Sequence, residues 1–339
     1  MMDLETFIII VYVWVDEWYQ QEIASLKQKR GRPPKMSDSE ILTLALVSQW
    51  RVGVPWQSER GFIRYAHAHL THLFGTLLQR SAFNHRVRHL YGVLVRLQTT
   101  LARRLHEATD LYEVVDCIAL PAYSLGHSKR QSTHWFWSSA TKGWARGTWF
   151  IGHKLLMSVC RSGAITGWLI GAGHLNDRWL LEGLLSGRQR TPQLREPTHP
   201  IRSGKQRHTP PPVGFIGAWA AVGKRSAYPY LADKGFNGYR WVAHWGQHYQ
   251  AVVVTTPHDN ARSERPWTRS EKKAFASHRQ IIETVFARLV LAFRIKQHQA
   301  HSITGLYTRI AAMTCAYNMA LLINRLYQRP GGALVSLIC

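Results

Sequence analysis

The sequence predicts an α/β protein in which an α-helical N-terminal region precedes a mixed β-sheet flanked by helices. Three observations lead to this prediction. Residues 3–107 show helical periodicity and helix-capping signals, residues 111–118 are β-branched and mostly apolar, and beyond them strand-like runs alternate with helical patterns. Because 45% of the 339 residues are hydrophobic, the chain has enough apolar material to form packed cores over most of its length.

The first predicted helix covers residues 3–28 and carries an apolar run from Phe7 to Val15. This run is far shorter than the roughly 20 residues that a membrane-spanning helix needs. The acidic residues Asp3 and Glu5 precede it, where a signal peptide would carry positive charge. We therefore expect a buried helix, and neither export nor a membrane partner.

A basic segment, residues 29–35, separates this helix from the next. Its glycine and two prolines exclude a helix and predict an extended linker. Ser37 and Glu40 have the spacing of a capping box, which predicts that a helix begins there. Further helical patterns continue to about Glu107, so we assign residues 1–108 to a helical N-terminal region.

The pattern changes at residue 111. Residues 111–118 predict a strand buried on both faces, and strands and helices then alternate. We expect a five-stranded mixed sheet in a second domain, residues 109–329, followed by a tail, residues 330–339. Residues 187–213 are rich in Arg, Pro, Thr and His without periodicity, which predicts a basic surface insertion. The further predicted strands are 149–159, 164–170, 228–232 and 249–256, and the predicted helices are 177–185, 271–293 and 306–327.

The charge of the chain points to an anionic partner. Lys and Arg total 43 against 20 acidic residues, which gives a net charge of +23 spread along the whole sequence. Such a field attracts polyanions, of which nucleic acid is the commonest in a cell. The competing interpretation is a basic protein of another kind, such as one associated with the ribosome. The four cysteines show no CxxC spacing, which favours a reducing cytoplasm.

Two aspartates lie at positions of the predicted sheet that suit metal binding or catalysis. Asp116 lies inside the apolar strand 111–118, where an ionised carboxylate costs several kcal/mol unless a partner such as a metal ion compensates it. Asp233 follows the short strand 228–232, and α/β folds place their chemistry at such strand ends. For Asp233 taken alone, an ordinary turn residue is the competing interpretation.

Glu283 is the third candidate. On the predicted helix 271–293, Glu283 lies at the edge of an apolar arc, so we expect its carboxylate to point inward. Arg279 precedes it by one turn, and the competing interpretation is a surface ion pair between these two side chains. The arc consists of Ile282, Phe286, Leu289, Val290 and Phe293, with Ala287 beside it.

Three inward carboxylates suit phosphodiester chemistry. Two Mg²⁺ ions about 4 Å apart stabilise both the attacking and the leaving oxygen of an in-line displacement. Carboxylate oxygens are hard ligands that favour Mg²⁺ or Mn²⁺, and the Cys and His sets typical of zinc are missing from the sequence. Neither a phosphate-binding GxxxxGK[ST] loop nor a GxSxG elbow occurs, which removes the usual support for an ATPase or a serine hydrolase.

Several segments, in order from about Gly31 to Asn324, resemble the bacterial insertion-sequence transposases of the DDE type. Ala232-Asp233-Lys234-Gly235-Phe236 and Arg279-Gln280-Ile281-Ile282-Glu283 are similar to the second and third catalytic segments of that family, and Val115-Asp116 resembles the first. The other matching segments are Gly31–Ser37, the arginine-rich stretch Ser81–Val87, the strand Trp149–Leu155 and the turn Asn176-Asp177.

The resemblance implies a ribonuclease H-like catalytic domain in which Asp116, Asp233 and Glu283 hold two Mg²⁺ or Mn²⁺ ions per active site. It also implies an enzyme that cuts the ends of a mobile element and joins the freed 3′-OH to target DNA, without a covalent enzyme intermediate. The expected partners are double-stranded DNA, both terminal repeats and target, and a second copy of the chain in a homodimer. The expected location is the bacterial cytoplasm, on the nucleoid.

Two features depart from this picture or compete within it. Many relatives carry a Tyr and a Lys on either side of the Arg and Glu of the third segment, and here those positions are Ala276 and Val290. The resemblance therefore places the chain in a branch that keeps only Arg279 and Glu283, with Arg279 orienting Glu283 or contacting DNA. Asp177 is a rival to Asp233 for the second carboxylate, and we rank it behind Asp233.

Basic and aromatic residues supply the candidate DNA contacts. In the helical N-terminal region, which we expect to bind DNA, Arg30-Gly31-Arg32-Pro33 resembles a minor-groove hook, for which a solvated linker is the alternative. Lys35 in the same linker is a further candidate DNA contact. Arg86 and Arg88 on a predicted helix are candidates for phosphate or base contacts, although most helix arginines are simply solvated. Further phosphate-contact candidates are Lys154, Lys234, Arg262 and Arg279. Core packing is favoured over base stacking for Trp135, Phe136, Trp137, Trp144 and Trp149.

Two other classes of function remain open from the sequence. A metal-dependent DNA nuclease would use the same carboxylates and stop at hydrolysis. A non-catalytic DNA-binding protein would need only the basic surface.

Overall fold

The structure is a computed structural model with two compact units. The helical unit comprises Met1–Leu101, Arg288–Ala300 and Thr304–Cys339, and the sheet unit comprises Ala102–Ala287 with His301–Ile303. The division differs from the predicted boundary near residue 108, because the C-terminal helices group with the N-terminal ones. The structure describes residues 2–26, 34–123, 140–145, 147–189, 216–219, 228–256, 267–331, 333–334 and 337–338.

The helical unit confirms the predicted helical N-terminal region. Helix α1 (Leu4–Glu22) ends before the predicted residue 28, and a short 3₁₀ turn, η1 (Ala24–Leu26), follows it. The predicted capping box is present at the start of α2: the Glu40 amide donates to Ser37 Oγ at 3.1 Å, and the Ser37 amide donates to Glu40 Oε2. The further elements are α2 (Asp38–Val47), α3 (Glu59–His69), α4 (Thr71–Phe74), α5 (Arg80–His89), α6 (Tyr91–Leu105), η4 (Ile295–Gln297) and α11 (Ile303–Leu326).

Helix α11 forms the core of the helical unit. The Cys315 thiol lies 3.2 Å from the carbonyl oxygen of Leu94, and the rings of Tyr307 and Tyr91 have centroids 4.5 Å apart. Among the described helices, α11 alone is long and apolar enough to cross a membrane, and 89% of its most apolar window is buried within the protein. An apolar helix buried in this way is typical of a protein core.

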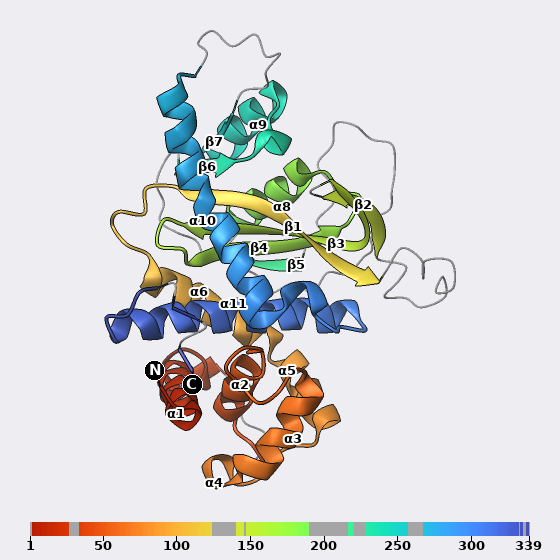
Figure 1. Ribbon diagram of the computed structural model, residues 1–339, viewed down its shortest axis with the longest axis vertical. Coiled ribbons are helices and arrows are strands. Elements are labelled where there is room, and N and C mark those ends of the chain that lie inside the picture. The colour runs from red at the N-terminus through yellow and green to blue at the C-terminus, as the bar shows by residue number, and fades with distance from the viewer. Residues whose placement is uncertain are drawn as a thin grey trace. The chain divides into compact units, whose positions relative to one another are not determined.

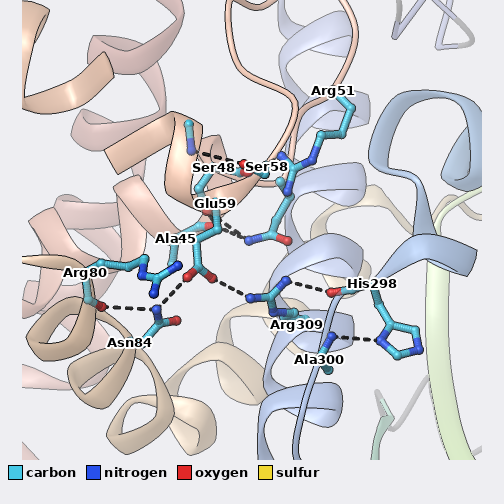
Figure 2. Close-up of polar contacts among 12 residues, drawn as sticks. Ala45, Ser48, Arg51, Ser58, Glu59, Arg80, Asn84, His298, Ala300 and Arg309 are labelled. Carbon is cyan, nitrogen blue, oxygen red and sulfur yellow. Dashed lines mark hydrogen bonds and ion pairs between the residues drawn. The ribbon is translucent and has the colours of Figure 1, made fainter. Parts of the chain in front are cut away.

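A polar network, shown in Figure 2, ties distant segments of the helical unit together. Glu59, at the start of α3, accepts a hydrogen bond from Arg309 Nη2 of α11 at 2.8 Å and another from Asn84 Nδ2 of α5. Arg309 Nη1 also donates to the carbonyl oxygen of His298 at 2.6 Å. The carboxylate is therefore shared by two donors from helices far apart in sequence, and its burial is compensated by an ion pair.

The sheet unit is built on a mixed sheet of seven strands in the order β5-β4-β3-β1-β6-β7, with β2 paired to β3 (Figure 1). The pairs β1–β3, β3–β4 and β4–β5 are antiparallel, whereas β6 runs parallel to β1 and β7 parallel to β6. The mixed sheet is confirmed, but the predicted number of five strands is wrong because β2 and β5 were missed. The strands are β1 (Glu113–Tyr123), β2 (Thr141–Ala145), β3 (Thr148–Cys160), β4 (Ile165–Ala172), β5 (Ile216–Trp219), β6 (Tyr228–Ala232) and β7 (Ala251–Thr255).

Alternation along β1 sends its side chains to two different faces. Val115 packs in an apolar cluster with residues of α8 (Asp177–Gln189) and α9 (Tyr239–Tyr249), and Cys117 packs against the same cluster. Asp116 lies between them in the strand, so its side chain projects from the opposite face. Figure 1 shows α10 (Arg269–Phe293) passing in front of β1, with α8 behind the sheet.

Candidate functional site

The pairing of β1 with β6 brings two of the predicted aspartates to the same level of the sheet. Val114 of β1 is aligned with Leu231 of β6 in a parallel pair. Two residues further along each chain stand Asp116 (114 + 2) and Asp233 (231 + 2), the latter immediately after β6. Parallel strands lie about 4.8 Å apart, so the two backbones hold these aspartates as lateral neighbours.

The electrostatics of Asp116 reflect this arrangement. Burial and, next in size, the negative charge of Asp233 together raise the pKa of Asp116 from 3.8 to about 7. The Cys117 amide donates to Asp116 Oδ1 at 2.7 Å, and this hydrogen bond and the charge of Arg279 lower the pKa by smaller amounts. Near neutral pH, Asp116 therefore shares its site with an uncompensated like charge, which a cation would relieve.

Asp233 is fixed by the turn that follows it. Its Oδ1 accepts a hydrogen bond of 2.8 Å from the Gly235 amide at the start of the 3₁₀ turn η3 (Lys234–Phe236). A Cβ atom added at Gly235 would lie 3.0 Å from Asp233 Oδ1 and 3.5 Å from Asp177 Oδ2. The absence of a side chain at Gly235 thus leaves room for both carboxylates, whose oxygens lie at most 6.5 Å apart (3.0 + 3.5).

Asp177, the predicted rival, also lies in this neighbourhood but already has a cationic partner. Lys154 Nζ donates to Asp177 Oδ1 at 2.8 Å and to the carbonyl oxygen of Leu175 at 3.0 Å. The negative charge of Asp177 raises the pKa of Asp116 less than that of Asp233 does. The ranking of Asp233 ahead of Asp177 therefore agrees with the charge arrangement, although both carboxylates surround the site.

Arg279 extends the site to α10. Its positive charge lowers the pKa of Asp116, which places the guanidinium within electrostatic reach of that carboxylate. Its Nε atom is buried and has no hydrogen-bond partner among the described residues. The residue before Arg279 lies close to the start of β1, because the hydroxyl of Tyr112, which precedes the strand, is 2.8 Å from His278 Nδ1.

The predicted inward orientation of Glu283 is wrong, because its side chain is exposed. The buried side of α10 includes Val285 and Ala292, while Ala287 and Val290 of the predicted arc are exposed. This rotates the centre of the buried stripe by about 40° away from Glu283. Among the ion pairs of the described residues none joins Arg279 to Glu283, so the alternative surface pair is not formed either.

The residues present fit a divalent cation in part. Asp116 and Asp233 offer hard oxygen ligands side by side, and neither forms an ion pair within 4 Å in the described part of the chain. No three His, Cys, Asp or Glu side chains among the described residues are close enough to form a ligand set. Glu283 follows Arg279 by one helical turn, about 6 Å along the axis, and its exposed side chain is free to change rotamer.

The candidate DNA contacts fall into three groups. Lys154 and Arg86 are ion-paired internally, Lys154 with Asp177 and Arg86 with Asp38 at 2.5 Å, so neither presents a free charge to a phosphate in this structure. Exposed side chains are those of Lys35, Arg88 and Lys234. Outside the described residues lie Arg30, Arg32, Arg262, Trp135, Phe136, Trp137 and the predicted insertion beyond residue 189.

Two tryptophans contradict the prediction of core packing. Trp144 on β2 and Trp149 on β3 are 50% and 49% exposed. The sequence contained a signal for this: Lys142 and Arg146 stand on either side of Trp144, and Gly143 and Gly147 interrupt the stretch, which is unusual for a buried strand pair.

Two contributors to the site were not singled out for their structural role. Gly235 provides the space between two carboxylates, and the partly buried Cys117 thiol interacts with Asp177. Burial, with the charges of Asp177 and Asp116, raises the pKa of Cys117 well above its usual value, so the thiol stays protonated.

Comparison of the chain with models of protein families, with curated proteins and with solved structures finds no match.

Proposed function

We propose that this chain is a DNA transposase that cuts and joins DNA by metal-dependent phosphodiester chemistry, with Asp116, Asp233 and Glu283 as the metal-binding carboxylates. The observation that carries the proposal is the lateral pairing of Asp116 with Asp233 across β1 and β6. Burial and the charge of Asp233 raise the pKa of Asp116, as expected for two neighbouring carboxylates that lack a cation between them.

The proposed fold of the sheet unit is ribonuclease H-like. Its support is a mixed sheet in which one strand carries an aspartate at its midpoint and the parallel neighbour carries another at its tip. Helix α10 brings Arg279 to Asp116 and carries Glu283 one turn later. These are the three kinds of position that the family resemblance assigns to the carboxylates.

The protein's own groups would share the work as follows. Asp116, Asp233 and Glu283 would hold the cations, and the lack of a side chain at Gly235 leaves room for the carboxylates of Asp233 and Asp177. The ion pair with Lys154 fixes the orientation of Asp177 beside the site. When bound, Mg²⁺ or Mn²⁺ supplies charge stabilisation at the attacking and leaving oxygens of the phosphodiester.

The proposed reaction has two balanced steps. In the first, water attacks phosphorus at the element end, the bond to the 3′ oxygen breaks, and a 3′-OH and a 5′-phosphate result. In the second, that 3′-OH attacks a phosphodiester of the target, forms a new bond to phosphorus and releases the 3′-OH of the target strand. The net charge of +23 supports a polyanionic substrate for both steps.

A strand-transfer assay tests this function. The full chain is incubated with Mg²⁺, a plasmid target and labelled DNA taken from the flanks of its own coding sequence, ending in a free 3′-OH. We expect joined products that disappear with EDTA and with Asp233→Asn. Hydrolysis without joining would refute the transposase and favour a nuclease, and DNA binding without either reaction would refute catalysis altogether.

A further inference from the structure

The β2–β3 hairpin carries a pair of tryptophans that the proposed catalytic site does not use. Trp144 and Trp149 are directly opposite each other in the antiparallel pairing, with ring centroids 5.0 Å apart in an edge-to-face arrangement. Both side chains are about half exposed, at 50% and 49%. Large aromatic side chains dominate the energetics of cores and interfaces, so an exposed and mutually braced pair indicates a binding surface.

A cation belongs to the same face of the hairpin. Lys142 is two residues before Trp144 on β2, so both side chains project from one face, and Lys142 Nζ lies 4.3 Å from the centre of the Trp149 ring. The other face is packed: Phe150 is 8% exposed, and a Cβ at Gly143 would collide with the Gly173 carbonyl oxygen. The exposed face thus presents two indoles and an ammonium group on a fixed backbone.

The charge around the hairpin specifies the sign of its partner. Residues 117–176 contain no Asp or Glu, so nothing in this stretch opposes an anionic ligand. The same stretch of sequence contains six lysines and arginines, Lys129, Arg130, Lys142, Arg146, Lys154 and Arg161, of which Lys154 is paired with Asp177. An acid-free basic segment that carries exposed aromatic rings suits a ligand with phosphates and planar rings.

The hairpin also lies at a defined place relative to the aspartates. Asp116 is aligned with Met157 of β3, and Trp149 stands eight residues before Met157 (157 − 149). At about 3.3 Å per residue, Trp149 is roughly 26 Å along the strand from the level of Asp116. It lies beyond the C-terminal end of β1, where Tyr123 is aligned with Ile151, and thus at the end of the sheet to which β6 delivers Asp233.

We propose that the β2–β3 hairpin is a binding site for single-stranded DNA, in which Trp144 and Trp149 stack on unpaired bases and Lys142 contacts the backbone phosphate. A duplex keeps its bases stacked on one another and offers these rings no free base face. The site is therefore expected to discriminate single strands from duplex, a property that the proposed catalytic reaction does not require.

Equilibrium binding in EDTA tests the site separately from catalysis, because no metal is present. The probes are an oligothymidylate of about 15 nucleotides, within the site sizes of single-strand-binding folds, and a duplex of equal length. We expect Trp144→Ala and Trp149→Ala in the full chain to weaken single-strand binding about 5- to 150-fold each. Duplex binding should stay unchanged, and Trp144→Phe should retain most of the affinity.

Two further variants sharpen the test. Tyr327→Ala removes another exposed aromatic side chain, 53% exposed on the helical unit, and is expected to leave single-strand binding unchanged. Lys142→Met is expected to lower the salt dependence of single-strand binding by about one released ion. Circular dichroism verifies that each variant is folded, and crosslinking of wild-type protein to bromodeoxyuridine-labelled oligonucleotide locates the contact without any substitution.

Three results would overturn the proposal. The first is an equal loss of single-strand and duplex binding in the alanine variants, which would indicate a general electrostatic surface. The second is wild-type single-strand affinity in folded variants. If such variants change only their oligomeric state, the tryptophans form an interface between copies of the chain. The third is crosslinking confined to peptides that contain neither Trp144 nor Trp149.

Discussion

Replacing Glu283 with Gln is expected to lower the rate of Mg²⁺-dependent DNA cleavage about a thousandfold. We expect the same loss of rate in Asp116→Asn and in Asp233→Asn. Metal ligation supplies several kcal/mol of transition-state stabilisation, and about 4 kcal/mol corresponds to that factor. Of the three substitutions, Glu283→Gln tests the proposed ligand set most sharply. Its exposed side chain lies one turn beyond Arg279 and outside the cluster around Asp116, so a loss of activity would require that it reaches the metal site.

The measurement is single-turnover cleavage of labelled element-end DNA with saturating protein, with DNA affinity determined in parallel. Glu22→Gln is the matched control, because Glu22 is an exposed glutamate of α1 in the helical unit. It removes the same charge and should leave the rate unchanged. A wild-type rate in Glu283→Gln, together with a thousandfold loss in Asp177→Asn, would transfer the third ligand to Asp177.

The second large effect concerns stability without metal. The pKa of Asp116 is raised from 3.8 to about 7 in the folded protein, so between about pH 4 and 7 the folded state binds more protons than the unfolded state. The free energy of unfolding must therefore fall as pH rises through this window. Asp116→Asn removes this penalty, and it should be more stable than wild type at pH 8 by about 1–2 kcal/mol after allowance for solvent screening.

Urea unfolding in EDTA at pH 5 and pH 8 measures this difference. The stabilisation of Asp116→Asn relative to wild type should be complete at pH 8 and clearly smaller at pH 5, because pH 5 lies near the lower end of the window between the two pKa values. Tyr112→Phe is a suitable control, because it removes a hydroxyl from the same region without changing a carboxylate. Equal stability of the Asn variant and wild type at both pH values would mean that Asp116 carries no uncompensated charge.

Local sequence patterns predicted most elements of the fold. The capping box of Ser37 and Glu40 marked the start of α2, and the β-branched run 111–118 marked β1. Strand β2 was missed because its residues, Thr141–Ala145, are polar, aromatic and glycine-rich, and its pairing with β3 supplies what its own pattern lacks. The assignment of the C-terminal helices to the helical unit was also beyond local pattern, since it depends on long-range packing such as that of Trp50 on Phe293.

The site was predictable to the extent that it depends on strands. Asp116 at a strand midpoint and Asp233 at a strand tip follow from the runs that surround them, and the register of β1 with β6 aligns them. Glu283 was oriented wrongly because a helical arc read from composition counts Val290 as buried, whereas packing buries Val285 and exposes Val290. A rotation of about 40° separates the predicted stripe from the observed one, and it decides whether the carboxylate lies at the edge of the stripe or outside it.

Titration of the protein with Mn²⁺ at pH 8, followed by the loss of the free-ion electron paramagnetic resonance signal, tests most directly whether Asp116 and Asp233 share a divalent cation. We expect saturable binding by wild type that weakens at least tenfold in both Asp116→Asn and Asp233→Asn, a loss of about 1.4 kcal/mol or more, while Glu22→Gln binds as wild type does. Wild-type affinity in either aspartate variant would contradict a cation site shared by Asp116 and Asp233.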